Sequence, residues 1–134
     1  MNDQDNPAAV PAAAVLDASK GMLQKQLYAI FTRPVDGPGP VFANIEEHLK
    51  FQVELERKGI MFAAGPLWTD DEQSWEGEGL VVVRAESREA AIAIAETDPM
   101  HKAGARTFHV QPWLINEGSM TIRLDFSTQK FAIT

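Results

Sequence analysis

The stretch NIEEHLKFQVELERKGIMFAAGP, residues 44–66, changes part-way along from a helical to an extended hydrophobic pattern. Asn44 is expected to cap a helix, with Glu47 three residues later in a capping-box arrangement. Gly59 offers the left-handed stop that commonly ends a helix. The apolar run Ile60–Leu67 then predicts a strand, and the proline near its end favours an edge position, because proline donates no backbone hydrogen bond.

The helix predicted over Asn44–Lys58 carries a histidine beside its apolar stripe. The residues that follow the helical period and are expected to face a core are Phe42, Ile45, Leu49 and Val53. At about 100° per residue, His48 lies roughly 60° from Ile45, on the flank of that stripe. Two interpretations stay open: the ring serves as a general base beside a pocket, or it closes one edge of the core.

Working outward, two runs that are apolar at both parities predict the central strands of a sheet. These runs are Gln26–Thr32 and Gly79–Ala85. Ser87 is expected to cap a second helix, which Pro99 ends, and Arg106–Trp113 predicts a fourth strand. The resulting order β-α-β-β-α-β predicts a ferredoxin-like α+β plait with an antiparallel sheet.

Helices cover only one face of such a sheet, so the apolar second face of the central strands needs another cover. A second copy of the sheet is the simplest one, and we expect a homodimer. We divide the chain into a flexible N-terminal tail over residues 1–24, the ferredoxin-like domain over residues 25–113, and a C-terminal β extension over residues 114–134. Apolar pairs in the tail, Val15-Leu16 and Met22-Leu23, leave docking on a partner subunit as an alternative.

The C-terminal extension holds the clearest alternating pattern of the chain, over Met120–Phe126. We expect this strand either to pair beside the fourth strand or to cross to the other subunit, because that sheet edge is otherwise open.

The amino-acid composition limits the kinds of molecule that the protein is expected to bind. Twelve Lys and Arg residues against 19 Asp and Glu residues give a net charge of −7, which argues against nucleic acid and anionic membrane surfaces. The chain has no cysteine, which removes thiolate chemistry and disulfides and fits a cytoplasmic protein. No apolar run approaches the ~18 residues that span a membrane, so we expect no membrane association.

Asp98 is the candidate partner of His48, although it lies 50 residues later in the chain. In the functional interpretation, Asp98 accepts the Nδ1–H of His48 and leaves Nε2 free as a general base. In the structural interpretation, Asp98 merely begins the turn before Pro99. The three histidines show no metal-ligand spacing, so we expect neither a metal nor another cofactor.

Several other residues are candidates for binding a small flat substrate. Arg33, at the end of the first strand, is placed to hold a carboxylate, although an ordinary surface arginine is the alternative. Aromatic side chains are candidates for a pocket wall, with core packing as the alternative. The substrate-binding candidates are Arg33, Phe62, Gly65, Pro66 and Trp68.

A family resemblance rests on an ordered set of motifs. These are Glu47-His48-Leu49, Gly59, Ala64-Gly65-Pro66, Ser87, Glu89-Ala90, Asp98-Pro99, Gly104 and Val110–Trp113. The set runs over about Leu27–Trp113 and resembles the YCII-related family of the dimeric α+β barrel superfamily. The resemblance implies a fold similar to that of muconolactone isomerase. For some members it also implies dehydrochlorination or isomerisation in aromatic-ring degradation. The family's proposed active pair falls on His48 and Asp98.

Three functions follow from these observations. The first is a small cofactor-free lyase or isomerase that uses His/Asp general acid–base catalysis on an unsaturated or aromatic-degradation metabolite. The second is a non-catalytic ligand-binding or accessory subunit, and the third is a dimeric interaction module. The fold alone does not decide among them. The first needs His48 and Asp98 within hydrogen-bond reach beside a cavity.

Overall fold

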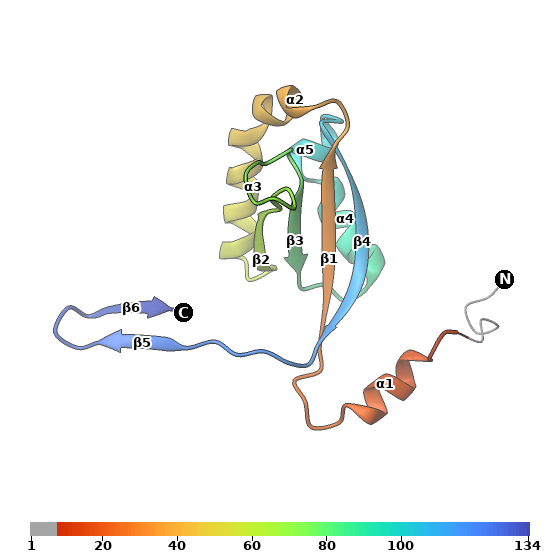
Figure 1. Cartoon of the computed structure of the whole chain (residues 1–134), viewed down its shortest axis with the longest axis vertical. Coiled ribbons are helices and arrows are strands. Elements are labelled where there is room, and N and C mark those ends of the chain that lie inside the picture. The colour runs from red at the N-terminus through yellow and green to blue at the C-terminus, as the bar shows by residue number, and fades with distance from the viewer. Residues whose placement is uncertain (1–7) are drawn as a thin grey trace. The chain divides into compact units, whose positions relative to one another are not determined.

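The computed structural model describes residues 8–134; residues 1–7, the start of the expected tail, lie outside the described part. The elements (Figure 1) are α1 (Ala12–Ala18), β1 (Lys25–Pro34), α2 (Pro38–Ala43), α3 (Ile45–Arg57), β2 (Met61–Pro66), β3 (Gly79–Val83), α4 (Arg88–Glu96), α5 (Pro99–Lys102), β4 (Arg106–Ile115), β5 (Ile122–Asp125) and β6 (Lys130–Ile133). The chain divides into two compact units, Gln26–Leu114 and the two ends, and each is described by itself.

The larger unit is built on a four-stranded sheet with the order β2-β3-β1-β4. The first and third strands are central and β2 is an edge strand, as the two doubly apolar runs and the proline of β2 predict. β1 pairs antiparallel with β3, with Tyr28 opposite Val83 and Ile30 opposite Val81. The fold is therefore the ferredoxin-like α+β plait expected from the sequence.

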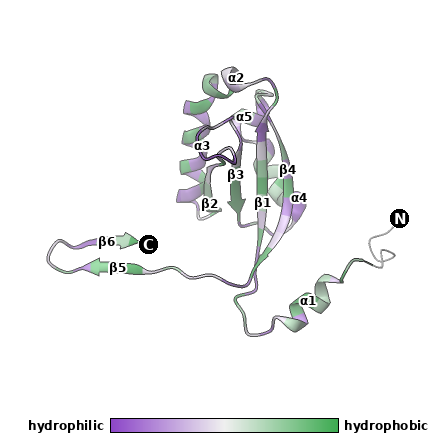
Figure 2. Cartoon of the chain, viewed as in Figure 1, coloured by the Kyte–Doolittle hydropathy of each residue, from purple (hydrophilic) through white to green (hydrophobic). Residues whose placement is uncertain are grey.

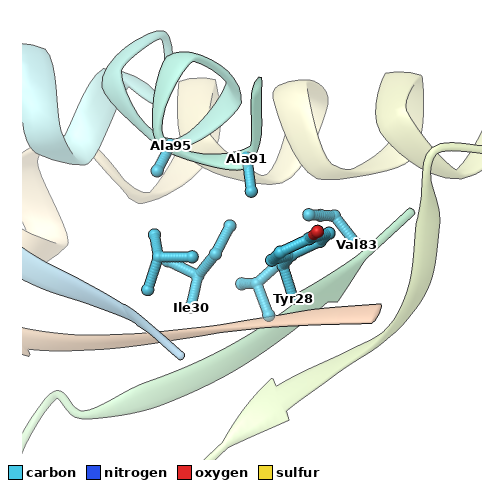
Figure 3. Close-up of a cluster of buried hydrophobic side chains, with 7 residues drawn as sticks. Tyr28, Ile30, Val83, Ala91 and Ala95 are labelled. Carbon is cyan, nitrogen blue, oxygen red and sulfur yellow. The ribbon is translucent and has the colours of Figure 1, made fainter. Parts of the chain in front are cut away.

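Small side chains let α4 approach the sheet closely. Ala91 and Ala95 of α4 point at Tyr28, Ile30 and Val83 on the strands, and all five belong to one buried cluster (Figure 3). Ser87 begins α4 as predicted, because its side-chain oxygen accepts a hydrogen bond from the N–H of Ala90 at 3.1 Å. The core thus lies between α4 and one face of the sheet.

Two short helices, α2 and α5, lie outside the helices predicted from the sequence. α2 begins at Pro38, whose fixed φ suits the first turn of a helix, directly after Gly37 at a φ of 62°. The predicted capping box is wrong, because the Asn44 side chain makes no cap hydrogen bond and instead donates to the carbonyl of Pro40 at 2.8 Å. α5 follows α4 after a single sharp break at Asp98.

The apolar stripe of α3 does not face a closed core. Figure 2 shows hydrophobic and hydrophilic residues alternating along this helix as the period requires. However, Leu49 is 54% exposed and Val53 is 49% exposed, whereas His48 and Leu55 are buried. The expected core contact for Leu49 and Val53 is therefore wrong, because the stripe of α3 borders an open hollow instead. It is also wrong for Phe42, an exposed residue of α2 whose ring packs on Trp75.

The smaller unit contains α1 and a two-stranded sheet. α1 forms within the segment for which the sequence predicted no secondary structure. β5 pairs antiparallel with β6, with Ile122 opposite Ile133 and Leu124 opposite Phe131. β5 thus forms a strand as predicted, in a two-stranded sheet with β6, and its expected pairing beside the fourth strand stays a prediction. A crossing to a partner subunit stays a prediction.

Candidate active site

His48 and Asp98 meet inside the larger unit. The Nδ1 atom of His48 lies 2.9 Å from each carboxylate oxygen of Asp98. His48 is 8% exposed and Asp98 is 4% exposed, so the contact is shielded from water. The fold therefore brings together the two residues that the sequence placed 50 positions apart.

Asp98 is held from two sides. It caps α5, and its Oδ1 accepts a hydrogen bond from the N–H of Met100 at 2.8 Å. An ionised carboxylate only accepts hydrogen bonds, so the Nδ1 atom of His48 must carry the proton that it donates to Asp98. In a neutral imidazole this leaves Nε2 with its lone pair, and no described residue is bonded to it.

A cavity of about 490 Å³ lies beside this pair, within the size range of small-molecule sites. From α3 the lining residues are Ile45, His48, Leu49, Gln52, Val53 and Glu56. The other walls come from the strands, from Trp68 and Trp75 in the β2–β3 loop, and from Arg106 at the start of β4. The cavity lies between α3 and the sheet, on the face that also carries α4, since Val81 and Ala64 share that face.

Three of the five substrate-binding candidates line this cavity and two do not. Gly65, Pro66 and Trp68 line the cavity. Arg33 and Phe62 do not line it: Arg33 is exposed, and Phe62 lies beneath the guanidinium of Arg84 at 5.3 Å. Gly65, Pro66 and Trp68 are therefore placed where a ligand in this cavity can contact them, whereas Arg33 and Phe62 are not.

Sequence reasoning missed Arg106 and Gln52. Arg106 is 6% exposed, its guanidinium lies 5.9 Å from the ring centre of Trp75, and burial lowers its pKa while the carboxylate of Asp98 opposes that shift. The Trp75 indole N–H in turn donates to the carbonyl of Glu78 at 2.7 Å. One signal was present for Gln52: it lies four residues after His48, which places it on the same face of the helix.

His101 is a half-buried structural residue. Its Nδ1 lies 2.6 Å from the carbonyl of Ala95, so it donates there, and its Nε2 accepts from the hydroxyl of Thr32 at 2.9 Å. The ring also packs on Phe108, with ring centres 4.5 Å apart. His101 thus ties α5 to α4 and to β1 in its neutral form.

Because His101 is half-buried, we expect the free energy of unfolding of the protein to fall in acid. Burial lowers the pKa of this ring below its usual 6.5 in the folded chain, so the unfolded chain takes up the proton first. The stabilisation is present above about pH 6.5 and is lost as the pH falls below it. Urea denaturation from pH 8 to pH 5 should show a smaller loss of unfolding free energy for His101→Gln than for the wild type. Parallel pH curves for the two proteins would contradict this assignment.

Residues 8–134 show neither a metal-binding cluster nor a membrane-spanning helix. They contain no cluster of three or more His, Cys, Asp or Glu side chains with a metal-binding arrangement. None of the helices formed by these residues has the length and apolar character needed to cross a bilayer.

Comparison with known protein families shows which family the chain belongs to. The sequence model of the YCII-related domain matches residues 26–114, most of the chain. The chain belongs to the YCII-related family. Its YCII-related domain holds every residue of the cavity and the His48–Asp98 pair. No curated protein matches the chain.

A solved structure resembles the YCII-related domain. It is the 5-chloro-2-hydroxyhydroquinone dehydrochlorinase of Burkholderia phenoliruptrix AC1100, in complex with 2,5-dihydroxybenzoquinone. The TM-score is 0.50 with 24% identity, and the match covers 65% of this chain and 92% of that one. This likeness supports the ferredoxin-like fold of the domain.

Proposed function

We propose that the protein is a small lyase or isomerase that uses His48 as a general base oriented by Asp98. One observation carries the proposal: a buried His–Asp contact of 2.9 Å lies beside a cavity of small-molecule size. The orienting role is supported by the hydrogen bond from Met100, because it fixes the Asp98 carboxylate independently of the histidine. The fold shared with a dehydrochlorinase adds support for this class of chemistry.

The proposed reaction needs no group beyond the protein and its substrate. His48 Nε2 takes a proton from a hydroxyl or from a carbon next to a carbonyl, and the electron pair moves into a C=O or C=C bond. In an isomerase the imidazolium returns that proton to another carbon. In a dehydrochlorinase the shifting electrons break a C–Cl bond and chloride leaves. The imidazolium then passes its proton to water, so the organic product contains one HCl less than the substrate. A general base of this kind contributes about 10²–10⁴-fold to a rate.

The walls of the cavity support the choice of a flat substrate. Trp68, Trp75 and Leu49 offer flat and apolar surface, which suits a ring of small unsaturated or aromatic-degradation type. The first assay therefore tests a panel of chlorinated hydroxyhydroquinones and unsaturated lactones as substrates. Turnover is measured as chloride release and as a change in the ultraviolet spectrum. Turnover that is unaffected by loss of His48 would rule out the proposed base.

A non-catalytic ligand-binding role is the second candidate, because the cavity alone satisfies it. The two functions separate in the same experiment. A ligand-binding protein would bind members of the panel without changing them, and His48→Ala would then alter affinity only.

We further propose a homodimer formed through the sheet face opposite α4. Side chains alternate along a strand, so Phe31 lies on the face away from the Ile30 cluster, and Phe31 is 42% exposed. On the same face Ala29 and Val82 are buried within one chain, so a partner would cover mainly the larger side chains. Sedimentation at micromolar concentration should give the dimer mass, and a stable monomer would contradict the proposal.

A further inference from the structure

Arg106 is a buried cation that contacts the ring of Trp75 but has no hydrogen-bond or ion-pair partner among residues 8–134. It is 6% exposed, and its Nε atom is buried without a hydrogen bond. Among residues 8–134 no ion pair or hydrogen bond engages its guanidinium. The carboxylate of Asp98 accepts hydrogen bonds from His48 and from the N–H of Met100, and it forms no ion pair with Arg106. Buried charged groups in folded proteins are normally paired, so this guanidinium calls for a ligand.

Gln52, on the α3 wall of the cavity, also has buried polar atoms without hydrogen bonds. Both its amide nitrogen and its amide oxygen are buried without a partner in the described part of the chain. Gln52 follows His48 by one helical turn on α3, and both side chains line the cavity with Arg106. Three polar side chains thus converge on a space whose other walls are largely apolar.

The charge of the cavity favours an anion at this place. Arg106 is the single Lys or Arg residue among the residues that line the cavity. Two glutamates, Glu56 and Glu78, also line it, but both are exposed, so water and salt screen them. The field of the buried guanidinium is screened much less, and His48 is a buried residue of the same cavity.

We propose that Arg106 and Gln52 hold an anionic or carbonyl oxygen of a flat ring while His48 removes a proton from another position of the same molecule. This inference rests on the proposed function and names the substrate class of the same site: a hydroxylated quinone or an enolisable ring ketone with at least two oxygens. When the proton leaves, negative charge grows on the oxygen that Arg106 contacts. Arg106 then stabilises the transition state more than the bound substrate.

The experiment measures binding, so it does not depend on turnover. Calorimetry compares 2,5-dihydroxybenzoquinone with its neutral 2,5-dimethoxy counterpart, and benzoate with benzamide, on the wild type and on Arg106→Met, Gln52→Leu and Arg57→Met. Arg57 is the matched control, because it is an exposed arginine of α3 that pairs only with Glu54. The wild type should prefer the acidic member of each pair.

Arg106→Met should weaken binding of the acidic probes about 30-fold or more, because it removes the charged partner of a buried hydrogen bond. The affinities of the neutral probes should change by no more than about threefold, because these probes form no charge-assisted hydrogen bond with the guanidinium. Arg57→Met should leave all four affinities unchanged. Gln52→Leu should give a smaller loss. If Arg106→Met does not fold, Arg106→Lys keeps the charge but loses the guanidinium fork, and it should weaken the acidic probes alone.

Other outcomes overturn the inference. If the wild type shows no preference for the acidic probes, or if Arg106→Met weakens both members of a pair equally, the guanidinium only supports the cavity wall. Failure of the proposed function looks different: the acidic probes still bind through Arg106, yet no member of the substrate panel turns over through His48. Conversely, turnover that depends on His48 but not on Arg106 would leave the function in place without this site.

Discussion

A folded His48→Ala variant is expected to turn over the substrate about 10²–10⁴-fold more slowly than the wild type. The substitution removes the only ring that the structure places both against Asp98 and at the cavity wall, among residues 8–134. It leaves the buried cluster beneath α4 intact, so the fold should persist. The measurement is the initial rate with the active member of the substrate panel, alongside far-ultraviolet circular dichroism.

His109→Ala is the matched control for this prediction. His109 is an exposed histidine of β4 whose ring contacts only the side chain of Gln111, at 3.3 Å. It should therefore keep the wild-type rate. A folded His48→Ala variant with full activity would falsify the mechanism, whatever the control shows.

Asp98→Asn is expected to slow turnover by a smaller factor, about 10²-fold or less. Asparagine is as good an N-cap as aspartate, so α5 should still begin at Pro99 and the protein should fold. The amide no longer offers two equivalent acceptors to Nδ1, so the ring of His48 loses its fixed orientation and tautomer. The expected signature is a fall in kcat with little change in KM.

Asp98→Ala separates the two roles of this carboxylate. It removes the cap of α5 as well as the partner of His48, so it should also lower the free energy of unfolding by about 0.5–2 kcal/mol. Equal rates for the asparagine variant and the wild type would show that Asp98 serves only as a cap.

The regular elements of the larger unit followed from sequence because burial and local pattern agree there. Gln26–Thr32 and Gly79–Ala85 are apolar at both parities, and the strands they predict are the two central ones. Ser87 caps α4 as its side chain predicts. α2 and α5 were missed because each is at most six residues long and begins with a proline, and such short elements have no hydrophobic period to read.

The sequence predicted which site residues lie on the same face of a helix. It did not predict which strand residues line the cavity. The helical period placed His48 at the edge of an apolar stripe and puts Gln52 on the same face. Arg106 gave no such signal, because a charged residue that opens a strand is usually exposed. The exposure of Leu49 and Val53 was also out of reach, since an apolar stripe predicts burial without saying how far the helix stands from the sheet.

The buried core and the cavity are built from different residues, and this separation affects how the sequence of the protein can diverge in evolution. The side chains that hold α4 on the sheet include Tyr28, Ile30 and Ala91, whereas Leu49 and Val53 of α3 belong to no buried cluster. Surface substitutions away from packed features usually shift stability by no more than about 0.5 kcal/mol. New ring shapes can therefore be accommodated by exchanging residues on α3 while the scaffold tolerates the change, so relatives can diverge in specificity more readily than in architecture.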